Sequence, residues 1–204
     1  MLFYLILNKR LSLFYGIKNG EIMILQTKRL ILRPWEKSDA QSLYENAKNP
    51  NVALMTGFPP HKSVEESLYI IENILTGSEN YAICKKEDNI AIGSIELKMK
   101  SKMFDENKKD ECEIGFWIGE KYWGNGFVPE AGERLIKRAF EDLGMNVIWA
   151  NYFAGNEKSK RAQEKLGFVY YKTFENEKAK LIDKTTDFNF TRLTRERYLL
   201  NTER

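Results

Sequence analysis

The segment with the clearest chemical potential is WGNGFVP, residues 123–129, which follows a predicted strand and opens a predicted helix. Glycine lets the main chain approach a ligand closely, and proline is favoured in the first turn of a helix. The free amides of residues 124–128 would point outward at the positive end of the helix dipole, which favours a phosphate or diphosphate. Because tight turns also use glycine for steric reasons alone, this loop by itself leaves a functional and a structural interpretation equally open.

Other phosphate-binding patterns are absent from the chain. Neither GxxxxGK followed by Ser or Thr nor GxGxxG occurs, which argues against a nucleoside triphosphatase and a dinucleotide-dependent dehydrogenase.

A second group of polar residues follows the next predicted strand, VIWANYFAG (147–155). Asn156 and Ser159 fall on the first turn of the helix that begins there, and simple helix capping is one explanation for them. Two adjacent parallel strands, each followed by a helix N-terminus, would form a cleft between splayed strand ends. Such a cleft suits a long ligand that carries phosphate.

The elements that position these residues alternate between strand and helix patterns in the order β-α-α-β-β-β-α-β-α-β-β. Three consecutive short strands predict antiparallel pairing, and the helix that joins 112–118 to 147–153 predicts a right-handed parallel crossover in a mixed sheet. We predict strands at 28–33, 81–84, 90–100, 112–118, 147–155, 168–174 and 188–193, and helices at 38–48, 63–75, within 123–144, and at 156–166.

The composition is that of a globular chain with one domain. The 204 residues carry 32 Lys and Arg against 29 Asp and Glu, a net charge of +3 with mixed signs, so no nucleic-acid partner is expected. Cys84 and Cys112 lack metal-site or disulfide spacing, and His61 is the only histidine. We therefore expect no metal, a reducing cytoplasm, and His61 as an ordinary loop residue.

The first 22 residues differ from the rest of the chain. MLFYLIL (1–7) is apolar, but Lys9 and Arg10 interrupt the run well short of the ~18 residues that a spanning helix needs. A secretory signal carries positive charge before its apolar stretch and a cleavage site of small residues after it, and this segment has neither. We expect residues 1–22 to be an extension of uncertain role and 23–204 to be the functional domain. A peripheral membrane anchor in residues 1–17 is the weaker alternative.

Three segments taken together resemble the GNAT N-acetyltransferase superfamily, in its branch of ribosomal-protein N-terminal acetyltransferases. They are TKRLILRPWEKSDAQSLY (27–44), WGNGFVPEA (123–131) and NEKSKRAQEKLGF (156–168), and the resemblance covers about residues 25–199. The family pattern is Q/R-x-x-G-x-G/A. Here Trp123 replaces the polar first residue, which is usual for the branch, and Val128 replaces the small last residue. The resemblance implies a single α/β domain of mixed α+β type, whose twisted, mostly antiparallel sheet of about seven strands is flanked by about four helices.

The resemblance also implies acetyl-coenzyme A as co-substrate. Its diphosphate would bind the amides of residues 124–128, its pantetheine arm would pair like a strand with residues 116–118, and Asn156 would hold that arm. The implied cofactor-binding residues are Phe116, Trp117, Ile118, Trp123, Gly124, Asn125, Gly126, Phe127, Val128, Asn156 and Ser159.

Two catalytic residues follow from the same resemblance. Many relatives use a Tyr as acid at the position of Gln163, so we assign that role to Ser159, one helical turn earlier, although a Ser hydroxyl is a weak acid. Glu113 matches a position where some relatives carry a catalytic glutamate, and it would act through water. A solvated strand-end charge is the equal alternative for Glu113.

The resemblance implies a primary amine as the acceptor. The sequence leaves its identity open among a protein N-terminus, a Lys side chain, a polyamine and an aminoglycoside. Residues 39–76 and the loop between 168 and 188 should form its site, with Trp35, Phe58, Tyr69 and Tyr81 as core residues or pocket lining. The chain would act as a monomer or a homodimer. A non-catalytic acyl-coenzyme A binding module is the alternative function.

Overall fold

The computed structural model describes residues 17–18, 21–101, 103–105 and 108–202. Its centre is an eight-stranded sheet with the strand order β3-β4-β5-β6-β7-β8-β10-β9. All neighbouring strands are antiparallel except β7 and β8, so the predicted mixed, mostly antiparallel sheet is confirmed. The strands are β3 (Leu25–Gln26), β4 (Leu30–Arg33), β5 (Asn80–Lys85), β6 (Ala91–Lys98), β7 (Glu111–Ile118), β8 (Val147–Phe153), β9 (Val169–Ala179) and β10 (Lys184–Thr194).

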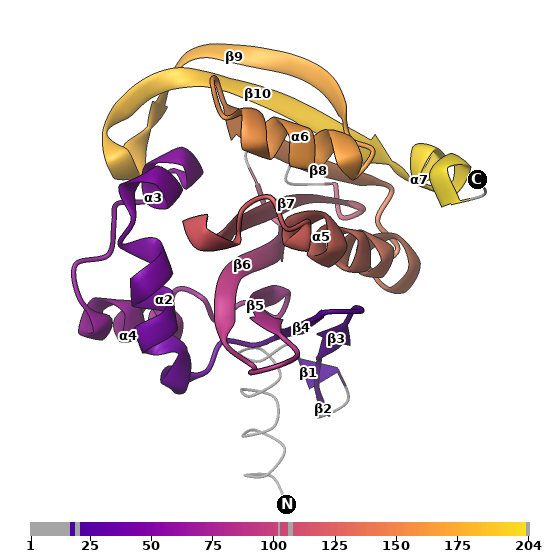
Figure 1. Ribbon diagram of the computed structural model, residues 1–204. Helices are drawn as coiled ribbons and strands as arrows, with labels where there is room; N and C mark the ends of the chain where they lie inside the picture. Colours follow the sequence, from indigo (N-terminus) through magenta and orange to yellow (C-terminus); the bar gives the residue numbers. More distant parts are fainter. Residues whose placement is uncertain (1–16, 19–20, 102, 106–107, 203–204) are drawn as a thin grey trace, which may run out of the picture.

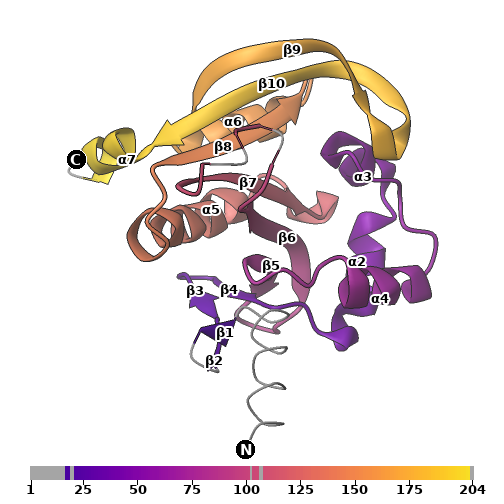
Figure 2. The same cartoon turned by 180° about the vertical axis from the view of Figure 1, so that it is seen from behind.

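Two groups of helices accompany the sheet (Figures 1 and 2). Helices α2, α3 and α4 gather at one side, whereas α5 and α6 lie next to each other at the other. The long hairpin of β9 and β10 arches over α6 and reaches α3. The helices are α2 (Ala40–Ala47), α3 (Pro50–Thr56), α4 (Val64–Asn73), α5 (Phe127–Lys137), α6 (Glu157–Lys165) and α7 (Arg195–Thr202), and α5 continues into a π-helical turn (Arg138–Asp142).

Alternation along the strands builds one hydrophobic cluster on each face of the sheet. On β5, Tyr81 and Ile83 belong to the cluster that includes residues of α5, whereas Ala82 and Cys84 belong to the cluster with α2 and α4. Successive side chains of a strand point to opposite faces, so a buried strand must be apolar on both. The strands that carry the predicted site are therefore held from both faces.

The structure contains more elements than the sequence predicted. The sheet has eight strands rather than about seven, and the described residues form six α-helices rather than about four. The helix predicted at 38–48 does end before Pro50, but the sequence analysis missed α3. Pro50 begins α3, and Asn49 caps it by accepting a hydrogen bond from the Asn51 amide at 2.9 Å. Proline needs no amide partner in the first turn, so the same residue can end one helix and start the next.

The N-terminal segment is described only in part. Strands β1 (Ile17–Lys18) and β2 (Glu21–Ile22) pair antiparallel as a ladder separate from the main sheet. The apolar run at residues 1–7 lies outside the described residues. The division into 1–22 and 23–204 and the membrane-anchor alternative therefore stay predictions. Among the described helices, none combines the length and the apolar character that crossing a bilayer requires.

Candidate functional site

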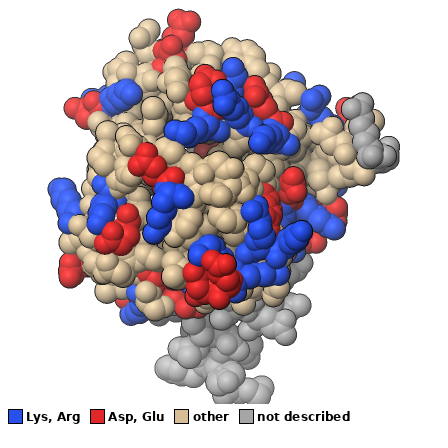
Figure 3. Space-filling model, in the orientation of Figure 1, with Lys and Arg blue, Asp and Glu red and all other residues tan. Residues whose placement is uncertain are grey.

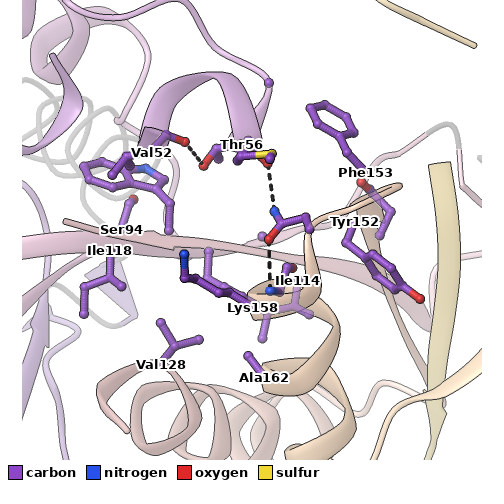
Figure 4. A pocket seen from close by; sticks show the side chains of 18 of the residues that line it. Val52, Thr56, Ser94, Ile114, Ile118, Val128, Tyr152, Phe153, Lys158 and Ala162 are labelled. Carbon is purple, nitrogen blue, oxygen red and sulfur yellow. Dashed lines mark hydrogen bonds between the residues drawn. The ribbon is translucent and has the colours of Figure 1, made fainter. Parts of the chain in front are cut away.

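The site is created where β7 and β8 separate. The two strands pair in parallel from Glu111 opposite Val147 to Glu113 opposite Trp149, and the pairing ends there although both strands continue. A cavity of about 1270 Å³ opens beyond this point, lined by β6, β7, β8, the loop before α5, α3, α6 and the tip of the β9–β10 hairpin (Figure 4). The predicted cleft between splayed parallel strands is thus present.

The register of β7 decides which main-chain groups face this cavity. Gly119 donates its amide to the Ile92 carbonyl at 2.8 Å, and in an antiparallel pair such bonds recur at every second residue. The main chain of Trp117 therefore faces β6, while that of Phe116 and Ile118 faces the splay. Trp117 contributes its side chain to the cavity instead, packed against the ring of Phe58 with 5.7 Å between centroids. Strand-like pairing uses the main chain of alternate residues, which here are Phe116 and Ile118. The predicted pairing of the pantetheine arm with residues 116–118 stays a prediction.

The loop before α5 keeps the geometry of an anion cradle. Gly124 and Gly126 adopt φ angles of +79° and +75°, which L side chains rarely tolerate. Asn125 closes the loop by donating to the Tyr122 and Trp123 carbonyls, each at 3.1 Å. Helix α5 begins at Phe127, two residues before Pro129. Within the part of the chain that the structure describes, none of the amides of residues 124–128 donates to a protein acceptor.

Basic side chains stand beside this cradle. Lys158 places its ammonium 3.9 Å from the centre of the Trp123 ring, and Arg161 and Lys165 follow at helical spacing along the same cavity wall. Figure 3 shows Lys and Arg side chains over α6, with acidic ones between them. Unbonded amides, the positive end of a helix dipole and nearby ammonium groups together fit a diphosphate. The Trp123 indole donates to the Ile118 carbonyl at 3.0 Å, which explains an aromatic first residue in the loop.

Asn156 caps α6, as the capping interpretation predicts, and it also ties α6 to α3, which the sequence did not indicate. Its Oδ1 accepts from the Ser159 amide at 3.1 Å, which caps α6, and its Nδ2 donates to the Met55 carbonyl of α3, also at 3.1 Å (Figure 4). Residues 101 positions apart are thereby joined across the cavity. Asn156 and Ser159 both line it. The predicted contact between Asn156 and the pantetheine arm stays a prediction.

Glu113 is part of a charged cluster rather than a solvated strand-end residue. It is only 8% exposed, accepts a short hydrogen bond from Ser101 and lies 3.3 Å from the Lys98 ammonium. Lys98 also contacts Glu96 at 3.2 Å. Burial works to lower the pKa of Lys98, but the two carboxylates outweigh it and raise that pKa. Gly115 leaves room for the cluster, since a Cβ there would lie 3.3 Å from Glu96.

Sequence reasoning missed Glu96 and Lys98, although both lie at alternate positions of the strand opposite Glu113. The four aromatic residues expected as core or as pocket lining do not line this cavity, and two of them are core residues. Trp35 is buried on the α2 and α4 side of the sheet, where Phe58 packs against the same cluster, and Tyr81 is buried on the opposite face. Tyr69 is 61% exposed outside the cavity. The lining near α3, α4 and the hairpin tip comes instead from Met55, Leu75 and Leu181.

The histidine and the cysteines lie outside this cavity. His61 is a loop residue but buried, with Nδ1 at 2.8 Å from the Ser67 hydroxyl, and burial lowers its pKa. Both cysteines are buried and unpaired. Across the described residues, no three His, Cys, Asp or Glu side chains come close enough to hold a metal ion.

Glu130 fixes the start of α5, and with it the loop. Its carboxylate accepts from the Thr27 hydroxyl at 2.5 Å and from the amide and Nε of Arg29 at 2.7 and 2.6 Å. Burial works to raise the pKa of Glu130, but these hydrogen bonds outweigh it, so the pKa is lowered from its ordinary 4.5.

We expect Glu130→Gln to lower the free energy of unfolding by about 1–3 kcal/mol at neutral pH, because charged hydrogen bonds are lost at a site 17% exposed. A lowered native pKa stabilises the fold above pH ~4.5 and loses that effect as pH falls through the native pKa. The difference between wild type and Glu130→Gln should therefore shrink below pH ~4.5 in urea unfolding. Glu133→Gln, on the exposed side of the same helix, is the control. An equal loss of stability in the control would contradict this role.

Comparison with known proteins places this geometry in a family. The model of the GNAT acetyltransferase domain matches residues 29–169. The uncharacterized N-acetyltransferase p20 of Bacillus licheniformis is 31% identical over 167 residues, which cover 78% of this chain and 91% of that protein. YdaF of Bacillus subtilis, whose name places it among ribosomal N-acetyltransferases, is 39% identical over 59 residues, 29% of this chain and 32% of its own length.

The fold is shared with a solved structure. The GNAT-family acetyltransferase from Bacillus anthracis superposes with a TM-score of 0.74 at 21% identity, over 85% of this chain and 99% of that one. The family match spans the splayed strands, the loop before α5 and all of α6, which are the elements that build the cavity. The chain therefore belongs to the GNAT acetyltransferase family, and it is an N-acetyltransferase that uses acetyl-coenzyme A as its co-substrate.

Proposed function

We propose that this enzyme transfers the acetyl group to a primary amine by direct attack within a ternary complex. The observation that carries the proposal is one continuous cavity, which joins the loop before α5 to the cluster of Glu96, Lys98 and Glu113. Acetyl-coenzyme A, when bound, supplies a thioester whose carbonyl carbon an amine can attack. Because cofactor cradle and carboxylates share one cavity, both substrates can be held together with no covalent enzyme intermediate.

The cofactor side of the proposal assigns each group a task. The amides of residues 124–128 bind the diphosphate, and Lys158 adds positive charge beside them. The main chain of Phe116 and the amide of Ile118 face the splay, where they can hydrogen-bond the pantetheine arm and polarise the thioester carbonyl. Asn156 keeps α3 and α6 together around that arm. The side chains of Trp117, Trp123, Phe127 and Val128 line the cavity wall.

The catalytic side rests on two residues. An ammonium cannot attack, so the acceptor nitrogen must lose a proton, and Glu113 takes it through water. Ser159 lines the cavity and donates a hydrogen bond to the sulfur as the carbon–sulfur bond breaks. The contacts of Glu113 with Ser101 and Lys98 hold its carboxylate on the cavity wall, which supports a positioned acceptor of protons.

We expect Glu113→Gln to lower kcat/KM by about tenfold to a hundredfold and to abolish the acidic limb of its pH profile, since a general base contributes on this scale. Glu96→Gln is the matched control, because Glu96 lies in the same cluster and also contacts Lys98. Measuring kcat/KM against pH for both variants separates the two carboxylates. Loss of the limb in Glu96→Gln alone would assign the base to Glu96 and remove Glu113 from the mechanism.

The acceptor is proposed to be a protein N-terminus or a small-molecule amine. The cavity wall near α3, α4 and the hairpin tip includes Met55, Leu75 and the exposed Leu181, together with Lys178 and Lys180, so it offers the acceptor apolar contacts and positive charge. No nucleic acid or membrane partner is part of the proposal. We place the enzyme in the reducing cytoplasm, because its two cysteines are unpaired. We propose that it acts as a monomer or a homodimer.

The test is the release of free thiol from acetyl-coenzyme A across a panel of amines. The panel contains peptides with free N-termini, peptides with only a Lys amine, a polyamine and an aminoglycoside. We expect turnover with at least one amine, and weaker cofactor binding by Asn156→Ala, measured by calorimetry. Binding of acetyl-coenzyme A without thiol release from any amine would favour a non-catalytic sensing module instead.

A further inference from the structure

Gln163 is a buried polar residue without a task in the proposed reaction. Its side chain is 1% exposed and lies outside the large cavity, whereas Ser159, one helical turn earlier, lines that cavity. A buried amide must satisfy its hydrogen bonds within the protein, so its partners define what it does.

Three hydrogen bonds fix the orientation of the Gln163 amide. Its Nε2 donates to the Asn151 carbonyl at 2.9 Å and to the Ser159 hydroxyl oxygen at 3.1 Å, while its Oε1 accepts from the Thr191 hydroxyl at 2.6 Å. A main-chain carbonyl can only accept, so the amide nitrogen must face Asn151 and the flipped orientation is excluded.

The direction of the Ser159 hydroxyl follows from this. Both protons of the Gln163 nitrogen are used, and one of them is given to the Ser159 oxygen. Among the described residues, the Ser159 hydroxyl donates to no protein acceptor. Its own proton is therefore available to a partner in the cavity. A hydroxyl that accepts a hydrogen bond becomes a better donor, because hydrogen bonds in a chain polarise one another.

We propose that Gln163 is a positioning residue, which holds the Ser159 oxygen as an acceptor and so directs the Ser159 hydroxyl proton at the coenzyme sulfur. This inference rests on the proposed function. In the transfer, the nitrogen–carbon bond forms, the carbon–sulfur bond breaks and its electron pair passes to sulfur. The proton lost by nitrogen leaves through water and Glu113. Ser159 donates a hydrogen bond to the developing negative charge and keeps its own proton.

The experiment titrates the thiol of coenzyme A bound to the full chain, because a hydroxyl that donates to the thiolate must lower the pKa of that thiol. The readout is the ultraviolet absorbance of the thiolate, and no acceptor amine is needed. Burial raises the pKa of the Cys84 and Cys112 thiols to about 12, so they do not titrate in the same range. Wild type, Gln163→Met, Ser159→Ala and the double variant are compared.

We expect the bound thiol of the wild type to titrate below that of free coenzyme A, and Gln163→Met to raise its pKa by about half a unit to one unit. Ser159→Ala should raise it at least as far, and Gln163→Met should add nothing in that background. Gln163→Met alone should lower kcat about threefold to tenfold and leave KM for acetyl-coenzyme A unchanged, since the hydrogen bond from Ser159 acts only as negative charge develops on the sulfur. Gln163→Glu keeps the size but presents an acceptor to Ser159, and it should raise the thiol pKa too.

Thr191→Val is the matched control, because it removes the Gln163 bond on the side away from Ser159 and leaves both amide donors in place. It should lower the unfolding midpoint and leave the thiol pKa unchanged. An effect of Gln163→Met that persists undiminished in Ser159→Ala, or a thiol pKa that no variant moves, overturns the inference while the proposed function stands. If calorimetry finds no binding of coenzyme A to the wild type, both fail.

Discussion

Gly124→Asp should weaken the binding of acetyl-coenzyme A by about tenfold to a hundredfold in calorimetry, the largest effect on cofactor binding that we expect from a single change. A Cβ at Gly124 would meet no atom within 4 Å, so a carboxylate there has space beside the free amides of the loop. It would repel the diphosphate and compete with it for those amides. At short range and intermediate dielectric this repulsion costs about 1.5–3 kcal/mol.

Gly124→Asn separates charge from backbone strain. Asn has nearly the shape of Asp, and both tolerate the left-handed conformation that Gly124 adopts at φ +79° better than other side chains do. We therefore expect the Asn variant to bind within about threefold of wild type. Equal affinity in the Asp and Asn variants would show that the diphosphate binds elsewhere. Raising the salt concentration should narrow the gap between them, because ions screen the repulsion.

Glu79→Ala should lower the free energy of unfolding by about 3–5 kcal/mol, because it removes the bidentate partner of a buried guanidinium. The Arg138 side chain would keep only the more distant Asp142 carboxylate, at 3.4 Å. Arg138 and Glu79 are 5% and 8% exposed and form a bidentate pair, with Nε to Oε2 at 2.7 Å and Nη2 to Oε1 at 2.5 Å. The Tyr81 hydroxyl also donates to Glu79 at 2.9 Å. The pair ties the π-helical turn after α5 to the residue that precedes β5.

Lys137→Ala is the control for this prediction. Lys137 and Glu141 form an ion pair on the same helical segment, at 3.7 Å, with both side chains about half exposed. Exposed pairs contribute less than ~1 kcal/mol, so the control should hardly move the urea midpoint. A change in midpoint with an unchanged m-value would show that stability, and not the compactness of the denatured state, has changed. If Glu79→Ala and Lys137→Ala both lower the free energy of unfolding by the same small amount, the buried pair does not stabilise the fold.

The pair of Glu79 and Arg138 acts on the same helix as Glu130. Helix α5 is fixed at its start by Glu130 and just beyond its end by Arg138. Because the helix is held at both ends, the loop that leads into it is held in place too. Anion binding by free amides depends on their fixed direction, since flexible donors would lose entropy when they bind. Stability contacts far from the cofactor therefore contribute to the cradle.

The proposed cofactor half of the site could be predicted from the sequence, because the strand, the glycine loop and the helix start that form it follow one another along the chain. Two glycines in the left-handed conformation, a helix that starts two residues before Pro129 and a preceding strand all follow from local conformational preferences. The order of strands and helices was also predictable, since hydrophobic periodicity is a local signal. Helix α3 was missed because the local signal of Pro50 is ambiguous between a stop and a start.

The proposed catalytic half of the site depended on contacts between residues distant in sequence. Glu96, Lys98 and Glu113 become a cluster only through the register of β6 against β7, and a shift of one residue would send them to the other face. The tie from Asn156 to Met55 and the bonds from Gln163 to Thr191 likewise join separate elements. Sequence alone thus determined the family, the fold class and the glycine loop that we propose as the anion cradle. Only the tertiary structure decided which polar groups meet across the cavity, because register and packing, and not local preference, bring them together.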